Sequence, residues 1–232
     1  VLFRSMVFGI MFAGLLLFFG LALNPLLANY KTEVVNNMIC DYQYVLKAPV
    51  ETSNDAAEKF CMTTLYESND EEISAYGIEN GSEYLSKVNV PKKKNEVVAS
   101  QGYLEKYSLK VGDRVTLKDK YGENKYTFKI VGSYYYPASL CVFMTNDNFN
   151  DVFDKDDGYF TGYFSNEKLK DIDDKYIATT ITQKDLTTVT DQLDDSMGMS
   201  FTLLVGFSVL IYIILMYLLS KLVIEKNEQN IS

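Results

Sequence analysis

The chain has 232 residues, a formal net charge of −9 at pH 7 and no histidine. An acidic protein repels phosphate groups, so this composition disfavours polyanions, nucleic acid included, as partners. Because histidine is the commonest general base, the commonest metal ligand and the usual activator of Ser and Cys nucleophiles, we expect no enzyme, no metal site and no cofactor.

The first predicted element is a membrane-spanning helix over residues 5–30, a segment without a charged side chain. Since a helix rises about 1.5 Å per residue, roughly 20 apolar residues cross a hydrocarbon core about 30 Å thick. Gly9 and Ala13 form a small-xxx-small step that favours close approach of another helix, although ordinary membrane glycines are a competing interpretation. We expect Asn24-Pro25 to kink or end the helix. A signal peptide is the alternative, but the apolar stretch is too long and no A-x-A site follows.

Residues 31–195 are predicted to form a mixed α/β domain, as one unit or as two small lobes. Helical spacing of apolar residues over 31–39 predicts a stalk that continues from the first apolar helix. The polar connector 91–95 is the expected boundary between two lobes. Alternating or compact apolar runs predict strands at 42–46, 60–64, 73–78, 96–99, 114–118, 126–130 and 134–144, the last interrupted by Pro137.

Helix starts are predicted at three polar residues. Ser100 is the expected cap of a short helix ending at Tyr107, and Thr145 of another with Asp147 in its first turn. Thr182 and Asp185 form a predicted capping box. The helical pattern that follows leads into the second membrane-spanning helix, residues 196–221, and then into a polar segment, residues 222–232.

Few charges set the expected topology. Arg4 flanks the first apolar segment, while Lys221 and Lys226 follow the second. Cytoplasmic flanks carry an excess of Lys and Arg, so we expect a multi-pass protein of the plasma membrane with both termini cytoplasmic and residues 31–195 extracellular. The predicted fold class is therefore an α+β membrane protein in which two transmembrane helices flank one extracellular domain.

The three cysteines allow two interpretations. In an extracellular domain Cys40 and Cys61 would pair, closing a loop whose disulfide contributes about 3 kcal/mol. Alternatively all three thiols are unpaired. Cys141 lies in an apolar run and is expected to be a small core residue.

Two further segments are candidate sites. Tyr134, Tyr135 and Tyr136 would form an aromatic surface for a partner or a substrate, unless they pack as ordinary strand residues. The acidic segment 154–158 fails as a calcium loop, because taking Gly158 as its sixth position places Phe at the first. We expect a solvated turn there.

Three runs together resemble the extracellular domain of FtsX-like (MacB-like) ABC transporter permeases. They are EVVASQGYLEKYSLKVGDRVTL at 96–117, KYTFKIVGSYYYP at 125–137 and VFMTNDNFNDVF at 142–153. The order of one helix, a large outer domain, a second helix and a polar segment also agrees with that family. Two further spans normally follow in the family, and a first residue other than Met also suggests a piece of a longer protein.

The resemblance implies a permease subunit that transmits motion from a separate cytoplasmic ATPase to the outer domain. The chain has no Walker A sequence, so the ATPase would be another protein. Such permease units work as dimers or pseudo-dimers in a lipid bilayer. The alternative is a two-span sensor with an extracellular ligand-binding domain. The residues expected to contact the ATPase, unless they simply form an interfacial helix end, are Lys221, Glu225, Lys226 and Glu228.

Overall fold

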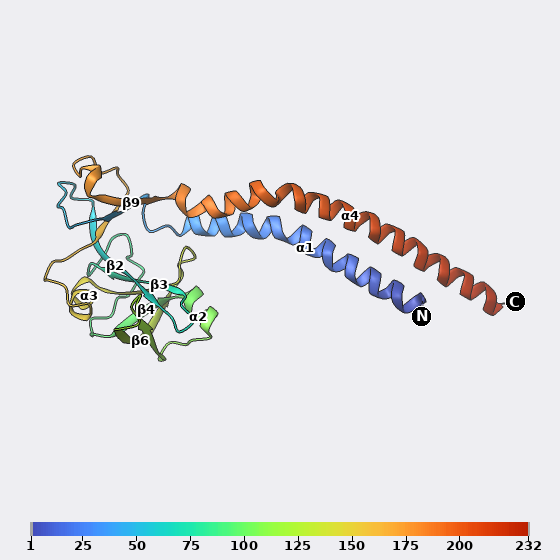
Figure 1. The fold of residues 1–232 in the computed structure, drawn as a ribbon, viewed down its shortest axis with the longest axis horizontal. Helices are drawn as coiled ribbons and strands as arrows, with labels where there is room; N and C mark the ends of the chain where they lie inside the picture. Colours follow the sequence, from blue (N-terminus) through green and yellow to red (C-terminus); the bar gives the residue numbers. More distant parts are fainter. Residues whose placement is uncertain (1, 232) are drawn as a thin grey trace. The chain divides into compact units, whose positions relative to one another are not determined.

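The computed structural model describes residues 2–231, without the side chains of residues 2, 3, 5, 6, 197 and 226–231. The chain is α+β and divides into two compact units. One unit is formed by the end segments, up to Thr32 and from Thr188, and the other by Glu33–Thr187. Figure 1 shows the ribbon of both.

Two long helices carry the apolar segments. Helix α1 spans Leu2–Asn36 and helix α4 spans Gln183–Ile231. Their apolar stretches, Val7–Asn36 and Gly198–Glu225, have mean hydropathies of 2.2 and 2.5. By length and composition both are able to cross a membrane.

Helix α1 does not end where its proline predicted. Pro25 lies inside the helix, which continues to Asn36. Proline removes one backbone hydrogen bond, but the rest of the ladder remains, and helices in apolar surroundings tolerate such a local loss. The predicted stalk is present up to Asn36, and the chain leaves the helix before Met38 and Ile39.

The domain contains one mixed sheet of nine strands. Their order is β3-β7-β4-β6-β5-β2-β8-β1-β9, and β3 also pairs with β2. Six strands thus close into a ring, and the other three extend from β2. The strands are β1 Tyr42–Leu46, β2 Glu58–Tyr66, β3 Glu72–Ile78, β4 Glu96–Ser100, β5 Arg114–Lys118, β6 Lys125–Tyr134, β7 Cys141–Thr145, β8 Gly162–Ser165 and β9 Ile177–Thr182.

Strand β2 joins the two parts of the sheet because it is nine residues long. Its first residues, from Glu58 to Phe60, pair with β8, whereas Tyr66 at its far end pairs with Lys118 of β5. The ring therefore combines strands from both sides of residues 91–95, so this connector does not separate two lobes.

Strand β7 is buried on both faces, and its alternate side chains enter different clusters. Val142 and Met144 belong to one buried cluster, called the inner cluster, while Cys141 and Phe143 belong to a second, called the outer cluster. A strand covered on both sides reads as a continuous apolar run, which explains the Leu-Cys-Val-Phe-Met sequence. The predicted strand 134–144 is two strands, because β6 ends at Tyr134 and β7 begins at Cys141.

Two short helices, α2 at Gln101–Tyr107 and α3 at Asn146–Val152, follow β4 and β7. The predicted cap of α3 is confirmed, since Thr145 Oγ1 accepts a hydrogen bond from the Asn148 amide at 3.2 Å. Ser100 occupies the predicted N-cap position of α2, but its side chain makes no capping hydrogen bond, because Ser100 Oγ accepts from the Cys141 amide at 3.0 Å. Ser100 is fully buried, and its hydroxyl is hydrogen-bonded to the backbone of β7. A 3₁₀ turn, η1, occupies Asp174–Tyr176.

All three cysteines are free and buried. Cys61 belongs to the inner cluster, whereas Cys40 and Cys141 belong to the outer one. The expected Cys40–Cys61 disulfide is not formed, because the two side chains lie in different cores. Burial raises the pKa of each thiol to about 12, which keeps it protonated and unreactive.

Candidate functional site

The first candidate site is the contact between α1 and α4. A Cβ added to Gly20 would lie 2.6 Å from Val205 Cγ2, and one added to Gly9 would lie 3.3 Å from Leu215 Cδ1. Ala13 is also buried. Small residues of α1 thus lie where α4 side chains approach, as the small-xxx-small step predicted. Such residues let two helices pack closely without a hydrophobic driving force.

A polar contact marks the end of this helix pair. Lys31 Nζ donates to Asp191 Oδ1 at 2.5 Å, and each side chain is a little under half exposed. An ion pair at this exposure contributes roughly 0.2–1 kcal/mol, so it specifies alignment more than stability.

The outward faces of the same two helices are apolar. Soluble monomers rarely expose contiguous apolar surface on this scale. The large side chains that are more than half exposed are Phe8, Met11, Phe12, Leu15, Phe18, Phe19, Leu21, Leu26, Met199, Leu203, Phe207, Leu210, Ile213, Ile214, Tyr217 and Ile224.

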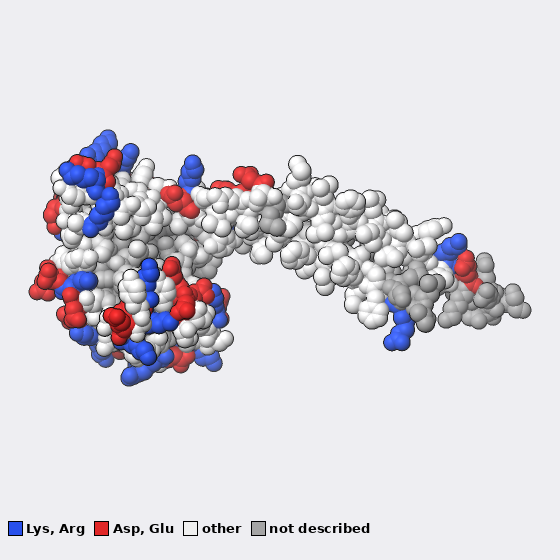
Figure 2. Space-filling view, in the orientation of Figure 1, with Lys and Arg blue, Asp and Glu red and all other residues white. Residues whose placement is uncertain are grey.

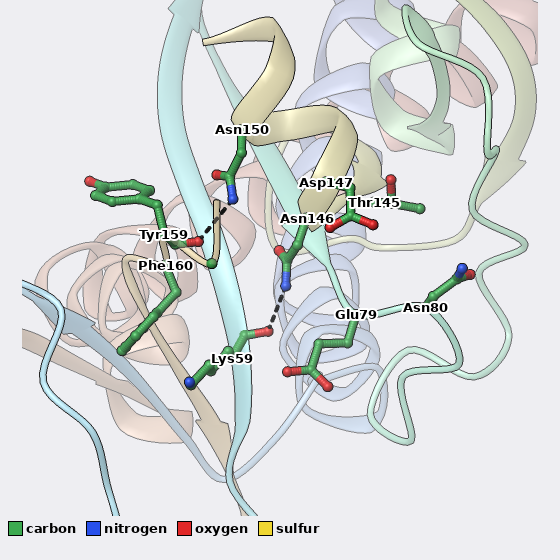
Figure 3. Close-up of a pocket in the computed structure, with 10 residues that line it drawn as sticks. Lys59, Glu79, Asn80, Thr145, Asn146, Asp147, Asn150, Tyr159 and Phe160 are labelled. Carbon is green, nitrogen blue, oxygen red and sulfur yellow. Dashed lines mark hydrogen bonds between the residues drawn. The ribbon is translucent and has the colours of Figure 1, made fainter. Parts of the chain in front are cut away.

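The second candidate site is a polar pocket of about 300 Å³ in the domain, shown in Figure 3. Four segments far apart in the sequence meet there: the start of β2, the turn after β3, the β7–α3 junction and the loop before β8. The lining residues are Lys59, Glu79, Asn80, Thr145, Asn146, Asp147, Asn150, Gly158, Tyr159 and Phe160.

Two amide side chains hold the walls of this pocket together. Asn146 Nδ2 donates to the Lys59 carbonyl at 3.4 Å, and Asn150 Nδ2 donates to the Tyr159 carbonyl at 3.3 Å (Figure 3). Asn146 Oδ1 is buried and has no hydrogen-bond partner among the described residues. This oxygen lies beside Gly77 of β3, where a Cβ would meet it at 3.0 Å, and an unpartnered buried acceptor costs free energy.

The electrostatics of the pocket favour ligands that donate hydrogen bonds. Glu79 and Asp147 are exposed carboxylates at its rim, while the ammonium group of Lys59 is already held by Glu51 at 2.8 Å. Burial raises the pKa of the neighbouring Glu58 carboxyl, and the charge of Glu79 adds to this effect. In the part of the chain that the structure describes, no three His, Cys, Asp or Glu side chains are placed to hold a metal ion.

The three predicted surface tyrosines do not form one surface. Tyr136 is buried in the outer cluster, which raises its pKa, and Tyr134 packs edge-on against Phe143 with ring centroids 5.9 Å apart. Tyr135 alone is exposed, and its hydroxyl donates to Glu33 Oε2 at 3.0 Å. The interpretation as packing strand residues is therefore correct for Tyr134, whereas Tyr136 packs in the core from a position beyond the end of β6.

The remaining predicted positions whose side chains the structure describes lie on the surface. Lys221 and Glu225 form an i,i+4 ion pair at 3.8 Å, with both side chains more than half exposed. The side chains of Lys226 and Glu228 lie outside the described residues. The acidic segment 154–158 is fully exposed, as expected of a solvated turn.

Sequence reasoning missed the pocket. Its lining residues are far apart in the sequence: 20 positions separate Lys59 from Glu79, and 67 separate Glu79 from Asn146. No short sequence motif therefore indicates that they form one site. Only the unusual density of asparagine and aspartate in the run 146–151 could have drawn attention to one wall. Comparison with protein-family models and with curated proteins finds no match to this chain.

Proposed function

We propose that this chain is part of a permease subunit of an FtsX/MacB-type ABC transporter. In this proposal the protein is a multi-pass protein of the plasma membrane, which α1 and α4 span. Both termini are cytoplasmic, and residues 31–195 form an extracellular domain. The observation that carries the proposal is a pair of helices whose exposed faces are apolar and which precede and follow a single compact domain in the sequence. The resemblance of residues 96–153 to the family's external domain gives the specific assignment.

In the proposed mechanism a separate ATPase moves the cytoplasmic ends of the helices, and the helices transmit that motion outward. Stiffness is the physical requirement. Helix α4 begins at Gln183, the residue after β9 ends, and continues without a break to Ile231. The close contacts of Gly9 and Gly20 with α4 would let the two helices move together. The ATPase contact is assigned to Lys221, Glu225, Lys226 and Glu228, and the working unit is a dimer or pseudo-dimer.

The test interrupts α4. A short Gly/Ser insertion after Ser196, in the full-length protein with its ATPase, should abolish transport while the outer domain stays folded, because a flexible linker cannot transmit force. The matched control places the same insertion in the β5–β6 hairpin at Gly122, an ordinary surface loop, where transport should persist. Undiminished transport with the Ser196 insertion would contradict the mechanism.

The topology has its own test. Protease added to intact cells should remove the domain, whereas a domain digested only after lysis would place it on the other side of the membrane.

The polar pocket favours a second candidate, a two-span sensor whose outer domain binds a small polar ligand. Its volume of about 300 Å³ and the exposed carboxylates of Glu79 and Asp147 at its rim are the supporting observations. Reading the gene beyond the codon for Ser232 would distinguish the two proposals. Two further apolar spans would support the permease, and a HAMP-like helix pair or a kinase would support the sensor.

A further inference from the structure

One face of the β5–β6 hairpin concentrates positive charge in an otherwise acidic domain. The register places Arg114 opposite Lys129 and Lys118 opposite Lys125, with Thr116 opposite Thr127 between them. Because strand side chains alternate, all six side chains share one face, while Val115, Leu117 and Phe128 enter the inner cluster on the other.

Placing like charges directly opposite each other destabilises a strand pair, and this hairpin does so twice. The two cation pairs are four residues apart along each strand, or about 13 Å, with the Thr116 and Thr127 hydroxyls in contact at 2.9 Å between them. Lys118 is held by Asp70 at 2.6 Å. Among the described residues no ion pair engages Arg114, Lys125 or Lys129.

A hollow of about 340 Å³ adjoins the first of these cation pairs. Its lining includes Arg114, Lys129 and Lys94, with Glu96 as its one carboxylate. Lys94 belongs to the exposed run 92–94, which the fold brings beside the hairpin. Figure 2 shows basic side chains along the lower edge of the domain, where Figure 1 places β6.

This local arrangement opposes the charge of the whole domain. Residues 31–195 contain 19 basic and 29 acidic side chains, a net charge of −10, which predicted that polyanions would be repelled. At physiological salt, charges more than about 8 Å from a bound group are largely screened. The nearest cations therefore determine whether an anionic group binds at this face. We propose that the β5–β6 face, with its adjoining hollow, binds the phosphate groups of a linear polyphosphate-type polymer without bases.

The choice of ligand follows from the residues present. Lysine and arginine provide charge-assisted donors for phosphate oxygens, and two cation pairs in a row match a chain that carries repeated charges. Base-tolerant binding of single-stranded nucleic acid relies on aromatic stacking platforms, whereas the centre of this face offers two threonines. A hollow beside the strands suits a polymer segment better than the flat surface of a bilayer.

The test uses the full chain in nanodiscs of uncharged lipid, with fluorescent linear inorganic polyphosphate as the probe. The double variant R114Q/K129Q should weaken binding about tenfold and lower the slope of log affinity against log salt by about two. Its thermal midpoint should not fall, because the variant removes a repulsive pair. The matched control K168Q/K170Q removes two exposed lysines from the loop after β8 and should change affinity less than twofold.

Each other outcome counts against the proposal. Equal losses in both variants would show that only net charge matters. Unchanged binding in R114Q/K129Q would remove the site altogether. Stronger competition by poly-glutamate, by a single-stranded oligonucleotide or by phosphatidylglycerol vesicles than by unlabelled polyphosphate would assign the surface to an acidic protein, a nucleic acid or a membrane instead.

Discussion

Gly162 lies in β8 at a point where this strand packs closely between β1 and β2. It pairs with Val45 of β1 on one side and with Phe60 of β2 on the other. A Cβ at this position would overlap the Tyr44 carbonyl oxygen and lie 2.7 Å from Phe60 Cζ. Both neighbours belong to buried structure, so neither is able to give way cheaply.

We therefore expect Gly162→Ala to lower the free energy of unfolding by about 3 kcal/mol, measured by urea denaturation. The control is Gly102→Ala in α2, where a Cβ would meet Leu140 at an ordinary 3.7 Å. That change should be neutral or stabilise by up to about 1 kcal/mol, since alanine favours a helix over glycine. Similar effects at the two positions would show that the β8 packing is looser than described.

Asp171 fastens the loop after β8 to the loop after β1. Its Oδ2 accepts from the Ser53 amide at 2.6 Å, and Thr52 Oγ1 donates to Oδ1 at 2.9 Å. These bonds, the Ser53 amide first, lower the pKa of Asp171 to about 2. A carboxyl whose folded pKa is below its unfolded value of about 3.9 stabilises the fold above that pH and ceases to do so as pH falls towards 2.

Asp171→Ala should accordingly lower the urea midpoint at pH 7, and the difference from the wild type should vanish between about pH 4 and pH 2. Asp157→Ala, which removes an exposed carboxylate from the 154–158 turn, is the control and should leave the midpoint unchanged across this range. A constant difference for Asp171→Ala at all pH values would mean that the carboxylate charge plays no part.

At the scale of elements, the α1–α4 contact depends on the size of one residue. A side chain at position 20 would collide with Val205, whereas nothing lies within 4 Å of a Cβ at Gly14. Cysteines replacing Lys31 and Asp191, whose charged atoms are 2.5 Å apart, should be joined by a short bismaleimide reagent, which spans the length of the lysine side chain that a disulfide does not. Adding Gly20→Leu should lower the crosslinking yield several-fold, because a bulky residue separates closely packed helices.

Gly14→Leu is the matched control and should leave the yield unchanged. Loss of crosslinking in both variants would show that any added bulk in α1 disturbs the helix, independently of its contact with α4.

At the scale of the whole molecule, the surface of α4 distinguishes a membrane helix from a soluble one. Leu210 is exposed near the middle of the stretch Gly198–Glu225. If that stretch crosses a bilayer, Leu210→Arg should reduce membrane integration, since a central arginine costs about 2.5–3.5 kcal/mol. The measurement is the fraction of protein that resists extraction with carbonate.

Val189→Arg provides the control, because this residue is also more than half exposed but precedes the apolar stretch. It should not alter integration. An Leu210→Arg protein that remains fully integrated, or a wild-type chain that is soluble without detergent, would contradict the proposed spans.

Local periodicity by itself determined much of the fold. The strands expected at 42–46, 73–78, 96–99 and 114–118 agree with β1, β3, β4 and β5 to within a residue, because an alternating or compact apolar run reflects burial directly. The local sequence likewise predicted the two long apolar helices and the Thr145 cap. Strands β8 and β9 were not predicted, since neither carries a clear alternation of apolar and polar residues.

Only the tertiary structure decided how these elements share their side chains. In the tertiary structure six strands close into a ring, and Cys40 and Cys61 lie in different cores. Tyr136 is buried, and the Ser100 hydroxyl accepts a hydrogen bond from the backbone of β7. The tertiary structure also assembled the polar pocket from segments that are distant in the chain. Partners of this kind lie dozens of residues apart, so their positions follow from strand order and register, which the pattern of neighbouring residues does not encode.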